Sequence, residues 1–208
     1  LLRKRFDKVG IIGHSEGGTI ALMLAAEKKA DFIVSLAGMA VSGRETLIWQ
    51  NRISLAASGI PSATVDSYCK ALGEVFDAST AGTPIPPASQ YNLPAALAQN
   101  LTAVTMQLQL PYLKYFLALD SRPLLGSISC PVLALNGTKD MQVEYESNLD
   151  ALRRGLPKNA KNKLEAIEGV NHLFQHCQTG MTSEYRDIEE TIDPKVLEKM
   201  QQWISDFK

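Results

Sequence analysis

The sequence predicts an α/β protein with a mostly parallel sheet and a helical segment inserted between two of its strands. Short apolar runs near both ends of the chain lack polar alternation, as strands covered on both faces do. Helical segments separate these runs, and strand–helix–strand order favours parallel pairing. The long middle stretch shows helical periodicity alone.

The first core part is expected to cover residues 1–41. Lys8–Ile12 is predicted to form a short buried strand, and Gly17–Lys29, which is rich in Ala and Leu, a helix. Asp31–Ala37 is a second apolar run with strand character. These three segments make one strand–helix–strand unit.

The middle part, residues 42–127, is interpreted as a helical cap inserted between strands of the sheet. No convincing strand pattern occurs in it, and a loop rich in proline interrupts it near Pro84. The predicted helices are Arg44–Ser58, Ala63–Asp77, Pro94–Leu108 and Tyr112–Leu119.

The last part, residues 128–208, returns to strand–helix alternation. Strands are predicted at Pro131–Leu135 and Lys163–Ile167, with a helix over Glu144–Leu156 between them. A final amphipathic helix is expected to run to Phe207. Its start is marked by Asp193 as N-cap, because proline at the next position suits the first helical residue.

Composition excludes several classes of protein. The chain has 208 residues, 45% of them hydrophobic, and a formal net charge of -1. A near-neutral balance gives no electrostatic reason to expect a nucleic-acid partner, and no apolar run reaches the roughly 20 residues that cross a bilayer. Cys69, Cys130 and Cys177 match neither a disulfide framework nor a zinc ribbon. The cellular compartment stays open.

The most informative motif is Gly-His-Ser-Glu-Gly-Gly at residues 13–18, between a predicted strand and a predicted helix. This context is typical of a nucleophile elbow, which exposes a serine on a sharp strand-to-helix turn. Ser15 would be the nucleophile, with Gly13 and Gly17 keeping the turn free of side chains. The backbone N–H of Glu16 would face a developing oxyanion.

Two other glycine-rich motifs with known functions agree less well with residues 13–18. A phosphate-binding loop requires a Lys-Ser/Thr pair, which the motif lacks, and the glycine spacing differs from that of a dinucleotide fingerprint. A merely structural turn is the remaining alternative.

A nucleophilic serine needs a base and a group that orients the base. Asp140 follows the predicted strand Pro131–Leu135, and His172 follows the strand Lys163–Ile167. Loops at the carboxyl ends of parallel strands meet at one edge of the sheet, where ligands bind. The chain order Ser, Asp, His is also that of the elbow-containing hydrolases.

The three motifs together resemble the α/β-hydrolase superfamily, in particular capped serine hydrolases of esterase or peptidase type. The resemblance rests on residues 13–18, on Cys130–Asp140 and on Gly-Val-Asn-His at residues 169–172. It implies that Ser15 is the nucleophile, His172 the general base and acid, and Asp140 the residue that orients His172. Some members carry the acid after the sixth strand, but residues 38–43 contain no carboxylate here.

The resemblance also implies that the sheet is incomplete. The family sheet has eight strands, and this chain supplies segments similar to the fifth through the eighth, its later half. The chain begins without Met and reaches a strand almost at once. We therefore expect an upstream segment of a longer polypeptide to complete the sheet and to supply a second oxyanion donor.

Other polar residues are assigned lesser roles. His14 is expected to pack beside the site. His172 and His176 have the spacing of a zinc-binding helix, but Leu173 stands where the catalytic glutamate of such a helix would be, so no metal site is predicted. His176 and Cys177 are interpreted as packing or helix-start residues.

Three further carboxylates could in principle orient His172. Glu168 is the nearest rival to Asp140, followed by Glu165 and Asp120.

The functional hypothesis is a serine hydrolase that cleaves a carboxylic ester, with a small-molecule ester or acyl substrate and no cofactor. Aminopeptidase and acyl-thioesterase activities share the same triad chemistry and stay open. A non-catalytic fragment that acts in binding or assembly is the alternative from another class. Candidate residues for an acyl pocket in the cap are Met106, Tyr112, Tyr115 and Phe116.

Overall fold

The computed structural model describes residues 2–207 and divides the chain into two compact units. The first unit comprises the residues up to Val41 together with those from Ser121 onward, and the second comprises Ser42–Asp120. A helical unit is thus inserted into an α/β unit.

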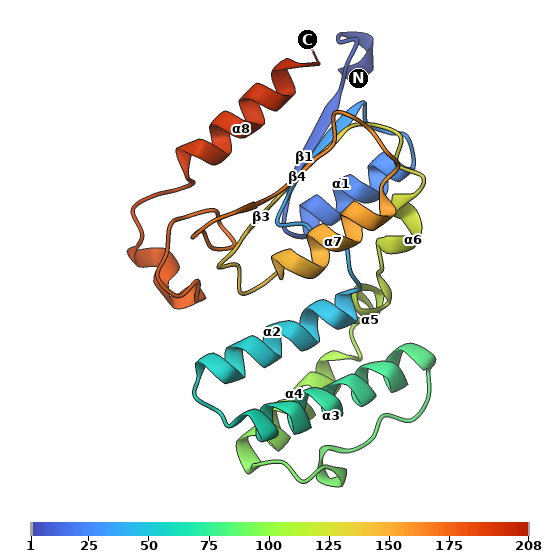
Figure 1. The fold of residues 1–208 in the computed structure, drawn as a ribbon. Helices are drawn as coiled ribbons and strands as arrows, with labels where there is room; N and C mark the ends of the chain where they lie inside the picture. Colours follow the sequence, from blue (N-terminus) through green and yellow to red (C-terminus); the bar gives the residue numbers. More distant parts are fainter. Residues whose placement is uncertain (1, 208) are drawn as a thin grey trace. The chain divides into compact units, whose positions relative to one another are not determined.

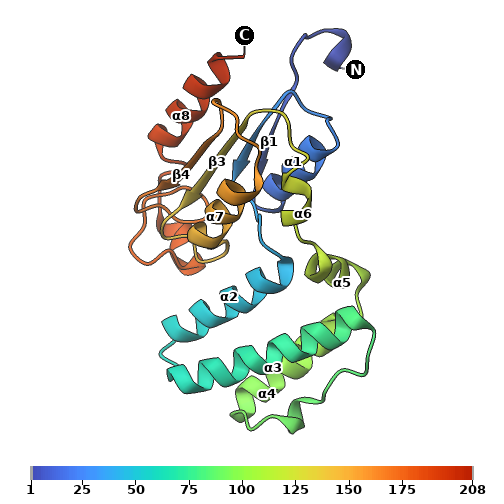
Figure 2. The ribbon, with the colours of Figure 1, turned by 45° about the vertical axis from the view of Figure 1, so that its right-hand side comes forward.

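The α/β unit is built on a four-stranded, fully parallel sheet with the order β1-β2-β3-β4. Figure 2 shows the strands side by side. They are β1 Gly10–His14, β2 Phe32–Leu36, β3 Val132–Gly137 and β4 Lys163–Ile167. The predicted fold class, α/β with a parallel sheet and a helical insertion, is confirmed.

Helices cover both faces of this sheet (Figure 1). On one face lie α1, Glu16–Ala26, and α7, Tyr145–Gly155, with the short α6, Arg122–Leu125. On the other face lies α8, Pro194–Ser205. Successive strand residues point to opposite faces, and both faces of β2 and β3 are buried, which explains why their sequences lack polar alternation.

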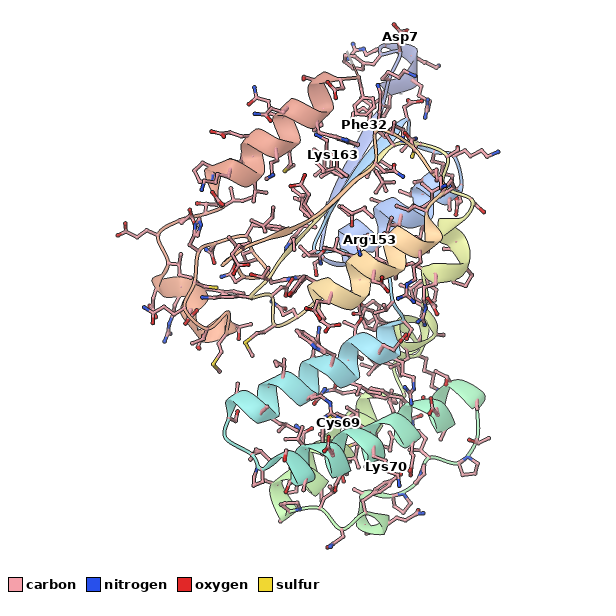
Figure 3. All side chains as sticks on the ribbon, in the orientation of Figure 1. Asp7, Phe32, Cys69, Lys70, Arg153 and Lys163 are labelled. Atoms are coloured by element: carbon pink, nitrogen blue, oxygen red, sulfur yellow. The ribbon has the colours of Figure 1, made fainter. Side chains whose placement is uncertain are left out.

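Aromatic side chains fasten α8 to the sheet. Phe32, on β2 (Figure 3), stacks on Phe207 with ring centroids 4.7 Å apart and meets Trp203 edge-on at 5.9 Å. The indole N–H of Trp203 donates to the carbonyl oxygen of Lys161 at 2.7 Å, so the buried ring keeps its polar group satisfied. The N-cap prediction is confirmed, because Asp193 accepts from the N–H of Lys195.

The helical unit contains α2, Gly43–Ala57, and α3, Ser62–Ala81, followed by the short η2, Ala88–Gln90, and by α4, Ala95–Gln107, and α5, Pro111–Ala118. It has its own apolar core, whose largest members are Tyr68, Leu72, Phe76, Leu101 and Leu108. Cys69, labelled in Figure 3, belongs to this core and is one of three free cysteines.

Two boundaries differ from the sequence prediction by more than three residues. Helix α3 continues to Ala81 instead of ending at Asp77, because the first left-handed residue that terminates it is Gly82. The inserted unit ends at Asp120 and not at residue 127. The reason is that Leu125 and Ile128 pack into the core beneath α1 and α7.

No described helix is both long enough and apolar enough to span a membrane.

Strand β1 forms one edge of the described sheet. The N–H of Ser15 donates to Leu36 of β2, and N–H groups alternate in direction along a strand. The N–H groups of Ile12 and His14 therefore point to the open side, and Ile12 is 53% exposed. An apolar edge strand is a template for further pairing.

We predict that a strand from elsewhere in the natural polypeptide pairs with β1. Hydrogen exchange followed by NMR should then show the amide of Ile12 protected as strongly as that of Gly13, which points toward β2. Fast exchange at Ile12 beside a protected Gly13 would contradict the prediction.

Candidate active site

Three loops that leave the carboxyl ends of parallel strands carry the predicted catalytic residues. Ser15 follows β1, Asp140 follows β3 and His172 follows β4. All three belong to the α/β unit. Since the strands are parallel, these loops emerge at the same edge of the sheet.

Ser15 occupies a strained turn. Its φ of 56° and ψ of -124° lie outside the regions that residues with a side chain ordinarily adopt, and α1 begins at the next residue, Glu16. Such a conformation costs about 1–3 kcal/mol and persists only where the surrounding structure imposes it. Here the N–H of Ser15 bonds to Leu36 at 2.8 Å, while its carbonyl accepts from Gly18.

The glycines around Ser15 have different roles. A Cβ on Gly13 would lie 1.9 Å from the carbonyl oxygen of Gly17, so position 13 must be glycine. A Cβ on Gly17 would meet no atom within 4 Å, contrary to the expectation that both glycines shape the turn. Gly18 is a tight position: a Cβ there would lie 2.8 Å from both Gly38 and Ser35.

His172 and Asp140 are joined by a buried hydrogen bond. The Nδ1 atom of His172 lies 2.8 Å from Oδ2 of Asp140, and the two side chains are 5% and 0% exposed. The other oxygen, Oδ1, accepts the backbone N–H groups of Gln142 and Val143 at 2.8 and 2.9 Å. Both oxygens of the Asp140 carboxylate therefore take part in hydrogen bonds, as a buried charged group requires.

The loops that carry these two residues are bonded to each other. The N–H of Lys139 donates to the carbonyl of Val170 at 3.0 Å, and the N–H of Gly169 donates to Oγ1 of Thr138 at 2.9 Å. The approach is close enough to exclude a side chain at Gly137, whose Cβ would lie 2.2 Å from the Val170 oxygen. The position of Asp140 relative to His172 is therefore set by backbone contacts.

Asn171 shapes the turn at His172 and was not singled out from the sequence. Its Oδ1 accepts the N–H groups of Leu173 and Gln175 at 2.9 and 3.0 Å, which is the bonding of an Asx turn. Phe174 within this turn has a φ of 61°. The available signal was the Asn directly before the histidine, since Asn favours such turns.

His14 lies beside the site, as expected. Its Nε2 is 2.8 Å from the carbonyl oxygen of His172, and the two imidazole rings lie 4.7 Å apart. The contact brings the His172 loop against the end of β1, next to Ser15. Among residues 2–207, no hydrogen bond joins Oγ of Ser15 to His172. Such bonds are often loose in unliganded sites.

Two of the rival carboxylates are placed differently: Glu165, on β4, pairs with Lys199 at 2.6 Å, and Glu168 is exposed. The third, Asp120, belongs to the helical unit. Within the part of the chain that the structure describes, Asp140 is the acid at Nδ1 of His172.

A half-buried tyrosine is linked to Asp140 through Gln142. The hydroxyl of Tyr185 accepts a hydrogen bond from Nε2 of Gln142 at 2.9 Å, while Gln142 also donates its N–H to Asp140. Burial raises the pKa of Tyr185; the hydrogen bond from Gln142 lowers it in part, and the nearby Asp140 charge adds to the rise. The phenol therefore stays protonated.

His176 is neither a packing residue nor part of a helix. The segment after His172 is a loop. The side chain of His176 is 56% exposed, and its Nδ1 is hydrogen-bonded to Glu190. The two histidines thus bond to different carboxylates and do not form the helical zinc pair that their spacing resembles.

The segment after β2 is held by two polar side chains that the sequence analysis missed. Asn148 accepts the N–H groups of Ala40 and Val41 at 2.6 and 3.1 Å, and Thr19 bonds both the N–H and the carbonyl of Met39. Both are buried polar residues in helices, α7 and α1, and they fix a strand-end loop at the same edge of the sheet as Ser15.

No protein-family model matches the chain, and no curated protein sequence matches it. Solved structures resemble it at low identity. The esterase RhEst1 from Rhodococcus sp. ECU1013 is 20% identical with a TM-score of 0.47, covering 94% of this chain and 64% of its own. The proline iminopeptidase of Mycobacterium smegmatis is 13% identical with a TM-score of 0.44, and the match covers 82% of this chain and 60% of the iminopeptidase chain.

The 2,6-dihydroxy-pseudo-oxynicotine hydrolase is 19% identical with a TM-score of 0.42, covering 78% of this chain and 34% of its own. The chain therefore spans between 34% and 64% of the length of these three structures. At these identities and TM-scores the likeness carries no argument about activity.

The two glycines at the start of α1 give a matched test of the turn. We predict that Gly18→Ala lowers the free energy of unfolding by about 1–3 kcal/mol, because the new methyl group would overlap Gly38 and Ser35. Gly17→Ala should leave it unchanged or raise it by up to about 1 kcal/mol, because Ala is the better helix former. Urea unfolding of both variants measures the difference, and equal losses would contradict this account.

Proposed function

We propose that the protein is a serine hydrolase of the α/β-hydrolase superfamily that cleaves a carboxylic ester through an acyl-enzyme. The observation that carries the proposal is the buried His172–Asp140 hydrogen bond, at the sheet edge where Ser15 occupies its strained turn. A nucleophile, a base and an orienting acid are the groups that acyl transfer through serine requires.

In the proposed first step, Oγ of Ser15 attacks the ester carbonyl carbon and gives its proton to Nε2 of His172. The backbone N–H of Glu16, in the first turn of α1, faces the negative oxygen of the tetrahedral intermediate. The intermediate collapses, and His172 returns the proton to the departing alcohol oxygen. An acyl group is then bound to Ser15.

In the second step a water molecule attacks the acyl carbonyl and gives its proton to His172. Collapse of the second intermediate releases the acid and returns the proton to Oγ of Ser15. Throughout, Asp140 accepts the Nδ1–H of His172, which keeps Nε2 available as the base and stabilises the imidazolium. The chain of steps uses no metal or cofactor.

The identity of the nucleophile is tested by Ser15→Ala. In the natural polypeptide that carries this sequence, we expect at least a roughly 1,000-fold loss of kcat with nitrophenyl esters, because residual catalysis without the nucleophile is small. Esters of increasing acyl length, thioesters and aminoacyl-nitroanilides define the substrate class. A fluorophosphonate probe should label the wild type only, and ester turnover independent of Ser15 would refute the proposal.

The role of Asp140 is tested by Asp140→Asn. The amide oxygen can still accept the N–H groups of Gln142 and Val143, but an amide NH₂ facing Nδ1 would leave Nε2 without its lone pair. We expect kcat to fall by about 10³–10⁴-fold with little change in KM. Asp150→Asn on α7, whose carboxylate pairs with Arg154 at the surface, is the matched control and should keep full activity. Equal activities of the two variants would exclude Asp140 as the orienting acid.

A further inference from the structure

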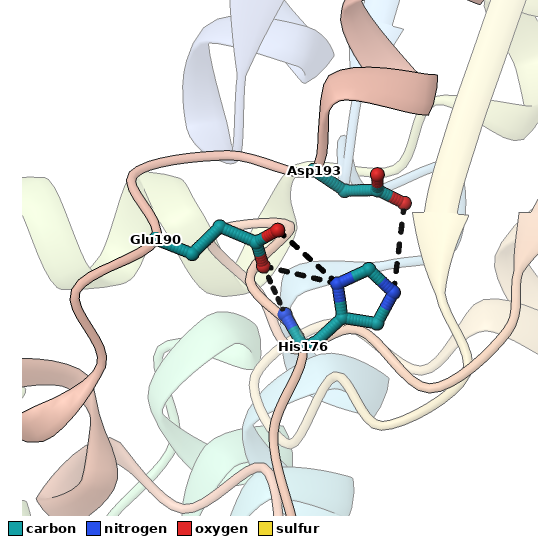
Figure 4. Close-up of side chains that lie close together, drawn as sticks. All are labelled: His176, Glu190 and Asp193. Atoms are coloured by element: carbon teal, nitrogen blue, oxygen red, sulfur yellow. Dashed lines mark hydrogen bonds and ion pairs between the residues drawn. The ribbon is translucent and has the colours of Figure 1, made fainter.

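A second group of ionisable side chains lies after the His172 loop and before α8. It consists of His176, Glu190 and Asp193, whose possible ligand atoms all lie within 4.8 Å of one another. Figure 4 shows the Glu190 carboxylate at the Nδ1 side of the imidazole and the Asp193 carboxylate at the Nε2 side. None of the three side chains bonds to Ser15, Asp140 or His172 in the described residues.

Asp193 is a largely buried residue, and one of its carboxylate oxygens faces His176. Its side chain is 4% exposed, and Oδ1 caps α8 by accepting the N–H of Lys195 at 2.9 Å. Oδ2 lies 3.8 Å from Nε2 of His176, too far for a hydrogen bond. Among residues 2–207 no group donates a hydrogen bond to Oδ2. A carboxylate oxygen that accepts no hydrogen bond and lies beside an imidazole nitrogen is available as a metal ligand.

Glu190 fixes the state of the imidazole. Its two carboxylate oxygens lie 3.2 and 3.1 Å from Nδ1 of His176, and Oε2 also accepts the His176 backbone N–H at 2.7 Å. A carboxylate at Nδ1 holds the proton there and leaves the lone pair on Nε2, the arrangement of carboxylate–histidine–metal sites. The free lone pair then faces the side on which Oδ2 of Asp193 lies.

The distance between the two facing atoms suits a metal ion. Metal–nitrogen and metal–oxygen bonds of about 2.0–2.2 Å at tetrahedral angles place the two ligand atoms about 3.4 Å apart. The observed 3.8 Å is longer than any N–H···O bond and needs only a small side-chain rotation to reach this value. His176 also lines a cavity of about 500 Å³ together with Gln178 and Asp187, which gives an ion a route from solvent.

We propose that Nε2 of His176 and Oδ2 of Asp193 bind a divalent first-row transition ion of the Zn²⁺ class, with Glu190 orienting the imidazole and water completing the coordination. An imidazole ligand favours such ions over Mg²⁺ and Ca²⁺, which prefer all-oxygen sites. The bound ion joins the loop after His172 to the first turn of α8. Its role is structural, and the triad chemistry does not use it.

The experiment is a calorimetric titration of the natural polypeptide with Zn²⁺ in a buffer that does not chelate metals, with Mg²⁺ as comparison. Saturable one-to-one binding of Zn²⁺ is expected. His176→Gln and Asp193→Asn should each lower the affinity at least about tenfold, because each removes a direct ligand. Asn is as good an N-cap as Asp, so the Asp193→Asn variant keeps the start of α8. Glu190→Gln should cost about 10–100-fold through the orientation of His176.

Two neighbours serve as controls. Glu189→Gln makes the same charge change on an exposed adjacent residue, and Cys177→Ser removes the thiol that lines the same cavity. Both should bind Zn²⁺ within about twofold of wild type, because neither residue is a ligand. Thermal unfolding gives a second readout: Zn²⁺ should raise the Tm of wild type and controls but not of His176→Gln.

Undiminished Zn²⁺ affinity in His176→Gln or Asp193→Asn would overturn the proposal. So would loss of binding in Cys177→Ser, binding of Mg²⁺ as tight as that of Zn²⁺, or the absence of saturable binding. The last result would show that the cluster holds no ion of this class.

Discussion

The buried hydrogen bond between His172 and Asp140 is the interaction on which the candidate site depends. It joins the loops that follow β3 and β4, so it requires the observed register of those strands, in which Gly137 lies opposite Ile167. The register alone is not sufficient, because a side chain at Gly137 would collide with the Val170 carbonyl and separate the loops. The placement of the two residues that we propose as catalytic acid and base is thus determined by backbone packing several residues away.

Backbone strain is concentrated at the same edge of the sheet. Residues 2–207 include four non-glycine residues with positive φ: Ser15, Ala37 and Phe174 follow β1, β2 and β4, while Lys28 lies just past the end of α1. Each such residue costs about 1–3 kcal/mol, which the rest of the fold must offset. Two apolar cores, one on each face of the sheet, hold the strands rigidly enough to impose these conformations. At Ser15, the proposed nucleophile, the strained backbone is held by the bonds of its N–H and carbonyl groups to Leu36 and Gly18.

The sequence predicted those features that depend on local pattern. Apolar runs located β1, β2 and β3, and an alternating pattern located β4. The motifs at the ends of three strands led to the prediction of Ser15, Asp140 and His172. Features that depend on long-range packing were missed. The end of the inserted unit depends on the burial of Leu125 beneath helices that lie far away in the sequence. The open space at Gly17 likewise depends on which neighbours surround it, whereas the motif suggested two equivalent glycines.

His172 and His176 lie four residues apart in one loop, but the carboxylates beside them differ in burial and in hydrogen bonding. The acid at His172 has both oxygens bonded, and the pair is closed to ions. The acid nearest Nε2 of His176 has one oxygen bonded and the other across a 3.8 Å gap. The loop is already tied to the α8 segment, since Asp193 N–H donates to Phe174 and Gln175 donates to Glu190. An ion in the gap would therefore strengthen an existing connection and leave the geometry at His172 unchanged.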